Sequence, residues 1–343
     1  MKVFHKTVFP ALFLLIGLVT EAAFPQFTTS AGFLLQSLGA RGLALGEGYV
    51  AVADGGQSLY WNPAGVLRSE KATQFAFTHR PDLFRNFLSF DCATLVFQLN
   101  PRLAVAAHFN YVDFGPTLFE DGVRDTHAYT VGVSLAVQVV SNLRTGLTAK
   151  RVAHEADPFS AHSVAADLGL IYRLENILNT RASESQLNLG ASLSNLGQKF
   201  EYIEGQTNPL PQFLRLGFAY DITSSSRWGN TGLSNLGMLL SFEYQNLLNE
   251  RENIWEWGGG VEVRFLEIVA LRVGYHERHP KTKATLLGKT LETGTTVGFG
   301  LSLPLNKLNT SLPLNLQFDF ASAPQNGFVE DYQMYTFGVN WER

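Results

Sequence analysis

The sequence contains a single cysteine, Cys92, so no disulfide can form within the chain. This argues against a small secreted domain framed by disulfides and fits an exported protein of the Gram-negative envelope. Positive charge is also scarce, with 26 Lys and Arg against 30 Asp and Glu. A nucleic-acid-binding surface needs clustered positive charge, so the composition argues against nucleic acid as a partner.

Long apolar runs are missing too. The longest one, residues 8–19, is shorter than the roughly 20 residues that a spanning helix needs. It follows two lysines and precedes the small residues Ala22 and Ala23, which is the arrangement of a secretory signal peptide. The sequence therefore predicts a cleavable signal peptide over residues 1–22.

Apolar residues nevertheless make up 45% of the chain, and they recur at every second position. In residues 312–320, LPLNLQFDF, leucine and phenylalanine alternate with proline, asparagine, glutamine and aspartate. Residues 127–140 and 254–265 follow the same scheme. Successive side chains of a strand point to opposite faces, so each segment predicts a strand with one apolar and one polar face.

About fourteen such segments follow one another, each about ten residues long, the length that a tilted strand needs to cross a bilayer. They lie at residues 72–79, 87–98, 103–113, 127–140, 143–152, 162–174, 186–195, 212–222, 236–246, 254–265, 268–277, 293–304, 311–321 and 332–342. The predicted fold class is all-β, a transmembrane outer-membrane antiparallel β-barrel of about 14 strands. The barrel is assigned to residues 71–343, in contact with outer-membrane lipid.

The connections predict an orientation. Tight joints at residues 100–102, 141–142 and 266–267 follow even-numbered strands. Long connections, at residues 113–125, 153–161, 195–211 and 277–292, follow odd-numbered strands. Outer-membrane barrels have short periplasmic turns and longer extracellular loops, so both ends of the barrel chain are expected on the periplasmic side.

A soluble β-sandwich or a lipocalin-like barrel would also alternate, with its apolar face inside. Here the polar face carries many glycines together with charged residues that we predict to face the lumen, namely Glu243, Glu256, Glu262, Arg264 and Arg272. A charged and roomy face favours a water-filled lumen over a packed core. The membrane barrel is therefore the preferred interpretation.

The stretch ARGLALGEGYVAVADGGQSLYWNPAG, residues 40–65, precedes every predicted strand and is rich in glycine. Its GEGYVA segment matches a dinucleotide-binding pattern, but the required strand, helix and distant acidic residue are not in place. Glycines allow tight turns and close backbone approach, and Asn62-Pro63 predicts a turn. Because a barrel of this size is too wide for strand side chains to fill, we expect residues 23–70 to plug the lumen.

This stretch resembles the N-terminal signature of PorV/PorQ-type outer-membrane proteins, which belong with the FadL-like (long-chain fatty-acid transporter) barrels. The plug motif that carries the resemblance comprises Gly39, Ala40, Arg41, Gly46, Gly48, Asp54, Tyr60, Trp61, Asn62, Pro63, Ala64 and Gly65. The family pattern has a second acidic or small residue followed by alanine, where this chain has Gly55-Gly56-Gln57.

Other groups of polar residues do not indicate a metal site or a catalytic site. The segment HERH, residues 276–279, lacks the helical spacing of a zinc motif and ends a predicted strand. No nucleophile-elbow motif occurs. We predict no metal site, no cofactor and no enzymatic activity.

Two functions remain open. PorV/PorQ-type relatives act in the type IX secretion system, so the resemblance implies an accessory or cargo-shuttling role with the secretion translocon and cargo proteins as partners. FadL-like relatives imply the alternative, a channel for uptake of hydrophobic small molecules with such a ligand in the lumen. Either function places the protein in the Gram-negative outer membrane.

Overall fold

The computed structural model describes residues 30–68, 73–81, 89–119, 122–156, 159–175, 177, 180, 182–249, 254–279, 293–308, 312–324 and 331–341. The predicted signal peptide, residues 1–22, lies outside these residues, and so do residues 23–29 and 69–70 of the predicted plug and residues 71–72 of the predicted barrel. None of the helices in the described part is long and apolar enough to cross a membrane.

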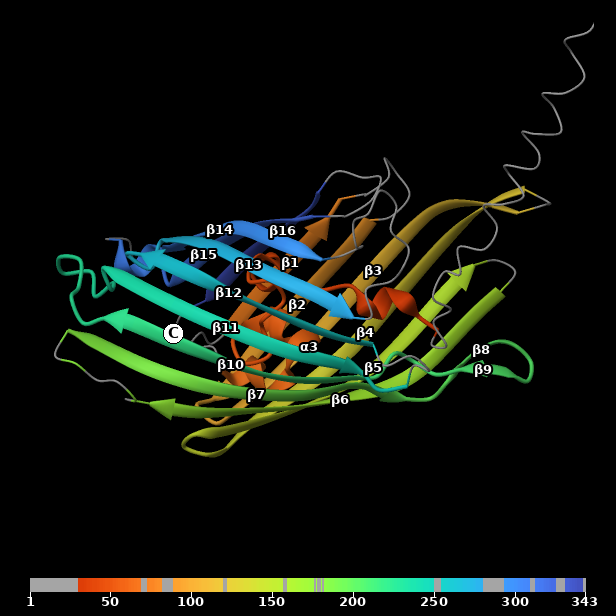
Figure 1. Ribbon diagram of the computed structural model, residues 1–343, viewed down its shortest axis with the longest axis horizontal. Coiled ribbons are helices and arrows are strands. Elements are labelled where there is room, and N and C mark those ends of the chain that lie inside the picture. The colour runs from red at the N-terminus through yellow and green to blue at the C-terminus, as the bar shows by residue number, and fades with distance from the viewer. Residues whose placement is uncertain are drawn as a thin grey trace, which may run out of the picture.

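Fourteen antiparallel strands form a closed barrel in the order β1-β16-β15-β14-β13-β12-β11-β10-β7-β6-β5-β4-β3-β2 (Figure 1). Their bounds are β1 Thr73–Arg80, β2 Ser89–Asn100, β3 Leu103–Phe119, β4 Gly122–Val140, β5 Leu143–Ala156, β6 Phe159–Glu175, β7 Ser183–Gly197, β10 Phe213–Ser224, β11 Leu236–Leu247, β12 Ile254–Phe265, β13 Val269–His279, β14 Gly294–Pro304, β15 Leu314–Ala323 and β16 Tyr332–Trp341. A 3₁₀ turn, η5 (Leu305–Lys307), follows β14. The predicted barrel is confirmed, and each of the fourteen predicted segments coincides with one strand.

The barrel closes where the first strand pairs with the last. Thr73 lies opposite Trp341, and the register continues to His79 opposite Tyr335. All backbone groups of neighbouring strands can then pair around the ring, which is what a sheet in lipid requires.

Burial along the strands is inverted relative to a soluble protein. In β4, Val131, Val133 and Leu135 are exposed, whereas the neighbouring Thr130 and Ser134 are buried. The same alternation of exposed apolar and buried polar residues recurs in β11 and β13. An apolar belt of this extent is stable only against lipid, so the soluble alternative does not hold.

Two predicted loops are strands instead. β3 continues through residues 113–119 and β4 through 122–125, and β5 and β6 continue through most of 153–161, so these hairpins extend beyond the other strands (Figure 1). A register shift between Asp113 and Pro116 absorbs the proline, which cannot donate a ladder hydrogen bond. The turn-forming residues of these segments therefore lie in paired strands and not in loops.

The third predicted loop, residues 195–211, contains a separate hairpin of β8 (Phe200–Ile203) and β9 (Gln206–Asn208). Of the fourth, residues 277–292, only 277–279 lie in the described part, and they belong to β13. The tight turns at residues 101–102, 141–142 and 266–268 are confirmed. We call the barrel end with these turns the turn end, and the opposite end the hairpin end.

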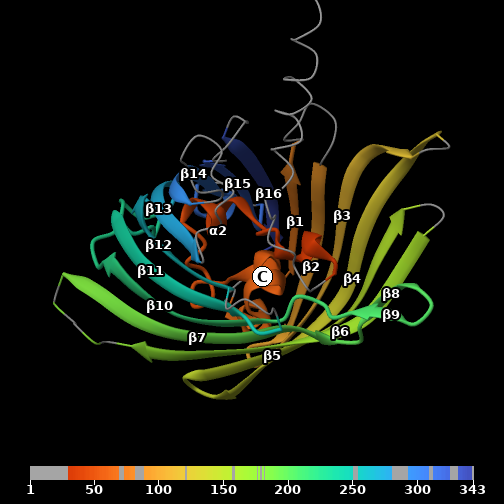
Figure 2. The same ribbon diagram turned by 45° about the vertical axis from the view of Figure 1, so that its right-hand side comes forward.

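Residues 30–68, the N-terminal segment, run inside the ring of strands (Figure 2). The segment consists of short elements, η1 (Gly32–Leu35), α2 (Ala40–Ala44), η2 (Gly55–Gln57), α3 (Ser58–Trp61) and η3 (Pro63–Arg68). It extends from the hairpin end, where Ser30 N–H donates to the Pro209 carbonyl (2.9 Å), toward β1 at the turn end.

The prediction that the lumen is filled with water is wrong where the strands face this segment. Thr148, Asn188, Arg215 and Glu262 point inward and are each 0% exposed. The segment packs against them, because the glycines that suggested a roomy face are the positions at which its backbone approaches the wall.

Candidate functional site

The closest packing joins the Gly46–Gly48 turn to β12 and β13. A Cβ atom at Gly258 or Gly274 would overlap backbone atoms of Gly46, and a Cβ at Gly48 would lie 2.8 Å from the Gly259 Cα. Real Cβ atoms do not come this close to backbone atoms, so glycine is required on both surfaces. Gly46 also has a φ of +60°, a conformation that glycine adopts without strain.

A Cβ at Gly46 would lie 2.5 Å from the backbone nitrogen and oxygen of Tyr275. Gly46→Ala is therefore expected to force the segment away from β13 and weaken its packing by about 1–3 kcal/mol. Limited proteolysis of the folded protein in detergent should then cleave the N-terminal segment faster. Gly32→Ala is the control, because no atom lies within 4 Å of the added Cβ. Equal cleavage of the two variants would contradict this packing.

Trp61 and Asn62 hold the middle of the segment together. The Trp61 indole N–H donates to the Leu38 carbonyl (2.8 Å). The Asn62 amide nitrogen donates to the carbonyls of Val50 and Leu170, both at 3.0 Å. The Asn62 side-chain oxygen accepts from the N–H two residues later (3.1 Å). Asn62, 0% exposed, thus links two parts of the segment to β6.

The rest of the aromatic-Asn-Pro-Ala-Gly signature packs closely against backbone atoms of the wall and of the segment itself. Pro63 and Ala64 lie against Gly146 of β5, and Gly169 of β6 adjoins the same two residues. Gly65 lies so close to the Ala53 carbonyl that a side chain there would overlap it. The signature residues therefore form a turn fitted to two small positions of the wall.

Two buried charges connect the segment to β10 and β11. Glu243 accepts hydrogen bonds from the N–H groups of Tyr49 (2.9 Å) and Val50 (2.6 Å), and lies 3.3 Å from Arg215. The Arg215 guanidinium faces the Tyr60 ring, 4.8 Å from its centroid. Burial raises the pKa of Tyr49 to about 12, so its phenol stays neutral in this interface.

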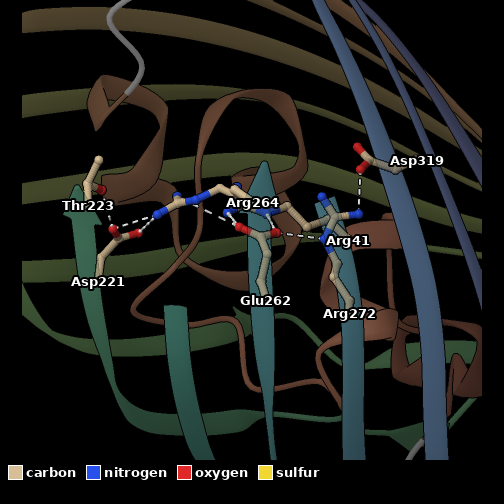
Figure 3. Close-up of polar contacts among 7 residues, drawn as sticks. All are labelled: Arg41, Asp221, Thr223, Glu262, Arg264, Arg272 and Asp319. Atoms are coloured by element: carbon tan, nitrogen blue, oxygen red, sulfur yellow. Dashed lines mark hydrogen bonds and ion pairs between the residues drawn. The ribbon is translucent and has the colours of Figure 1, made fainter. Parts of the chain in front are cut away.

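Arg41 of α2 pairs with Glu262 of β12 (Figure 3). Its Nε and Nη2 donate to the two carboxylate oxygens at 2.9 and 2.8 Å, the bidentate geometry that makes Arg–carboxylate pairs strong. Arg272 donates to the same carboxylate (2.6 Å) and to Asp319 of β15 (2.6 Å). Glu262 is 0% exposed and holds two arginines from opposite sides of the interface.

Arg264 extends the network along β12 (Figure 3). Its guanidinium lies 3.7 Å from Glu262 and donates to both oxygens of Asp221 at 2.6 and 2.7 Å. The Thr223 hydroxyl donates to Asp221 as well (3.1 Å). Three arginines and three carboxylates thus balance in charge across β10, β12, β13, β15 and the segment.

The remaining predicted residues lie nearby. Glu256 pairs with Arg278 at the hairpin end of β12, and Asp54 lines a cavity at the turn end. Gly39 precedes α2 with a φ of +94°. Arg215, Asp221 and Asp319 are not among the predicted site residues, although the alternation of β10 and β15 places all three on the inner face.

Two larger cavities lie between the segment and the wall. The hairpin-end cavity of about 490 Å³ is lined by Glu47, Arg80, Glu256, His276 and Arg278 among others. The turn-end cavity of about 230 Å³ is lined by Arg41, Asp54, Arg264, Arg272 and Gln317 among others. Within the described part, no group of three His, Cys, Asp or Glu side chains is placed to hold a metal ion.

A protein-family model described as "Type IX secretion system protein PorV" matches residues 21–231, more than half of the chain. None of the curated proteins compared with the chain matches it.

Among solved structures, the chain is similar to the toluene transporter TodX of Pseudomonas putida, with 12% identity, 89% of this chain and 97% of that chain covered, and a TM-score of 0.48. The CymD monoaromatic hydrocarbon channel shares 12% identity over 87% and 98% of the two chains, with a TM-score of 0.45. LpxR from Salmonella typhimurium shares 8% identity over 79% and 100%, with a TM-score of 0.42.

Proposed function

The chain belongs to the PorV family of type IX secretion system proteins, and on this premise we propose that it is a non-enzymatic accessory of protein secretion in the outer membrane. In this role it accompanies cargo proteins and associates with the translocon, and cargo does not pass through its own lumen. The predicted signal peptide would direct its export.

The observation that supports this role is the fixed attachment of the N-terminal segment. Arg41, Glu243 and Asn62 bind it to three different parts of the wall; the contact of Glu243 is buried, and those of Arg41 and Asn62 are partly buried. Where Gly46 and Gly48 meet the glycines of β12 and β13, the packing leaves no space for a folded or extended polypeptide between segment and wall. Such a barrel suits a membrane anchor and docking partner better than a protein-conducting pore.

Uptake of hydrophobic molecules is the alternative function. It would need a continuous apolar path, whereas charged side chains such as Arg80, Glu256 and Arg272 interrupt the lining of both cavities beside the segment. Charged groups keep their water shells and favour polar contents. The lining therefore favours the secretion role.

The test uses the native host. An epitope tag in the β8–β9 turn, at exposed Gly205, should co-purify other secretion components from cross-linked outer membranes. Deleting the gene should retain secreted proteins inside the cell, and the tagged chain should restore their release. If secretion is unchanged and uptake of a labelled hydrocarbon falls instead, the hydrophobic-uptake function replaces this one; if neither changes, both are wrong.

A further inference from the structure

The hairpin-end cavity has the size of a small-molecule site. Its volume of about 490 Å³ falls within the roughly 300–1,000 Å³ of typical ligand pockets. Apolar side chains such as Leu35 line it together with charged ones. Of the charged residues, Glu256 and Arg278 form an ion pair and neutralise each other. The remaining acidic and basic side chains in the described lining are those of Glu47 and Arg80.

Arg80, the last residue of β1, is a buried cation without a carboxylate partner among the described residues. It is 7% exposed. Its Nη1 donates to the side-chain oxygen of Gln36, and its Cζ lies 4.2 Å from the centroid of the Tyr332 ring. Buried charges are normally paired, and a guanidinium has five N–H donors. Arg80 therefore retains both the charge and the donors that bind a ligand carboxylate.

Glu47 supplies the opposite charge. Its φ of +63° lies in the left-handed region, which residues with a side chain rarely adopt. Gly46 and Gly48 on either side pack against backbone atoms of the wall, so the glutamate between them is held at the cavity. No basic side chain of the described part lies within ion-pair distance of its carboxylate. Within these residues, the cavity thus has one unpaired anion as well as one unpaired cation.

His276 of β13 adjoins Glu47. It is 6% exposed, and its Nδ1 has no hydrogen-bond partner in the described part of the chain. Gly258, against which Gly46 packs, lies opposite His276 in the strand register. Glu47 and His276 also line a second, smaller cavity together. Because a neutral imidazole has one nitrogen that accepts a hydrogen bond, both side chains can accept from one ammonium group.

Arg80 lies apart from this pair. Three strands, β16, β15 and β14, stand between β1 and β13 in the barrel. At a strand spacing of about 4.8 Å, β1 and β13 are about 19 Å apart along the wall. The cation and the anion are therefore on separate parts of the cavity lining.

From this arrangement we propose that the hairpin-end cavity binds a small organic zwitterion with an aliphatic spacer between its two charges. Its carboxylate pairs with Arg80, its ammonium group pairs with Glu47 and His276, and its spacer lies against apolar lining such as Leu35. An anion alone would leave Glu47 without a counter-ion, and a cation alone would leave Arg80 without one. This site goes beyond the proposed secretion role and requires no movement of the N-terminal segment.

The experiment measures binding to the purified full chain in a non-ionic detergent by titration calorimetry. Aminohexanoate carries both charges, whereas hexanoate and hexylamine have the same number of carbons and one charge each. Aminohexanoate should bind about tenfold or more tightly than either, since hydrogen bonds to a charged group contribute at least the free energy of one factor of ten. Aminopropanoate has both charges but a shorter spacer, so it should also bind more weakly.

Charge-removing variants assign the two ends of the ligand. Glu47→Gln keeps the shape of the side chain and should make hexanoate bind at least as tightly as aminohexanoate. Arg80→Gln should favour hexylamine in the same way. The control is Glu184→Gln, which removes an exposed carboxylate outside the cavity and should leave all affinities unchanged.

Two results would overturn the proposal. The first is that the unmodified chain binds no aminohexanoate, or binds it no more tightly than hexanoate and hexylamine. The second is that Glu47→Gln leaves the order of the affinities unchanged, and this variant decides alone if Arg80→Gln does not assemble. Secretion by the host tests the proposed function separately.

Discussion

Deletion of residues 30–66 is expected to convert a closed barrel into a permanently open pore. The fourteen strands pair around the full ring without any contribution from the N-terminal segment, so the barrel should still assemble. Removing the segment exposes inward-facing polar residues such as Thr148, Asn188 and Ser192, which water can hydrate. Planar-bilayer recordings should show a large and steady conductance for the deletion variant, whereas the full chain should be closed or nearly so.

Substitutions within the segment provide a graded control. Trp61→Ala removes the indole that binds the Leu38 carbonyl, and Asn62→Ala with Pro63→Ala removes the link to β6. Both variants should give intermediate, flickering currents in the same recordings. A deletion variant that assembles and remains fully closed would show that the segment does not close the lumen.

The strands could be predicted because lipid imposes a strict rule on them. Each membrane-crossing strand must place an apolar side chain outward at every second position, so residues 254–265 were predicted with the bounds of β12 itself. Beyond the bilayer this rule no longer applies. The outer parts of β3 and β4 carry polar and turn-forming residues such as Asp113 and Pro116, which is why they were predicted as a loop.

From the sequence, residues of the N-terminal segment and residues of the barrel wall could each be predicted, but the contacts between them could not. The motif drew attention to Arg41 and Gly46, and alternation placed Glu262 on the inner face, but neither signal says that Arg41 and Glu262 meet across 221 residues. Glycine carries no side chain to indicate a partner. The fit between Gly46 and Gly274 therefore became visible only with the register of the barrel and the path of the segment.

Glu262→Ala is expected to cause the largest loss of stability of any substitution in the charge network. The carboxylate is 0% exposed and hydrogen-bonds to Arg41 and Arg272, so its removal leaves the buried Arg272 and the partly buried Arg41 facing one another. Breaking a buried ion pair from one side typically costs about 3–5 kcal/mol. Urea-induced unfolding in detergent, followed by tryptophan fluorescence, should show this loss in the free energy of unfolding.

Two further variants test whether the loss of stability in Glu262→Ala comes from the buried charge network. Glu184→Ala removes an exposed carboxylate whose partner, Arg227, lies 3.8 Å away, and it should leave the unfolding curve unchanged because such surface pairs contribute little. Adding Arg41→Ala to Glu262→Ala should recover part of the lost stability, because it removes a partly buried cation that Glu262 no longer compensates. An unfolding curve for Glu262→Ala that matches Glu184→Ala would contradict the network, since it would mean that water already compensates these arginines.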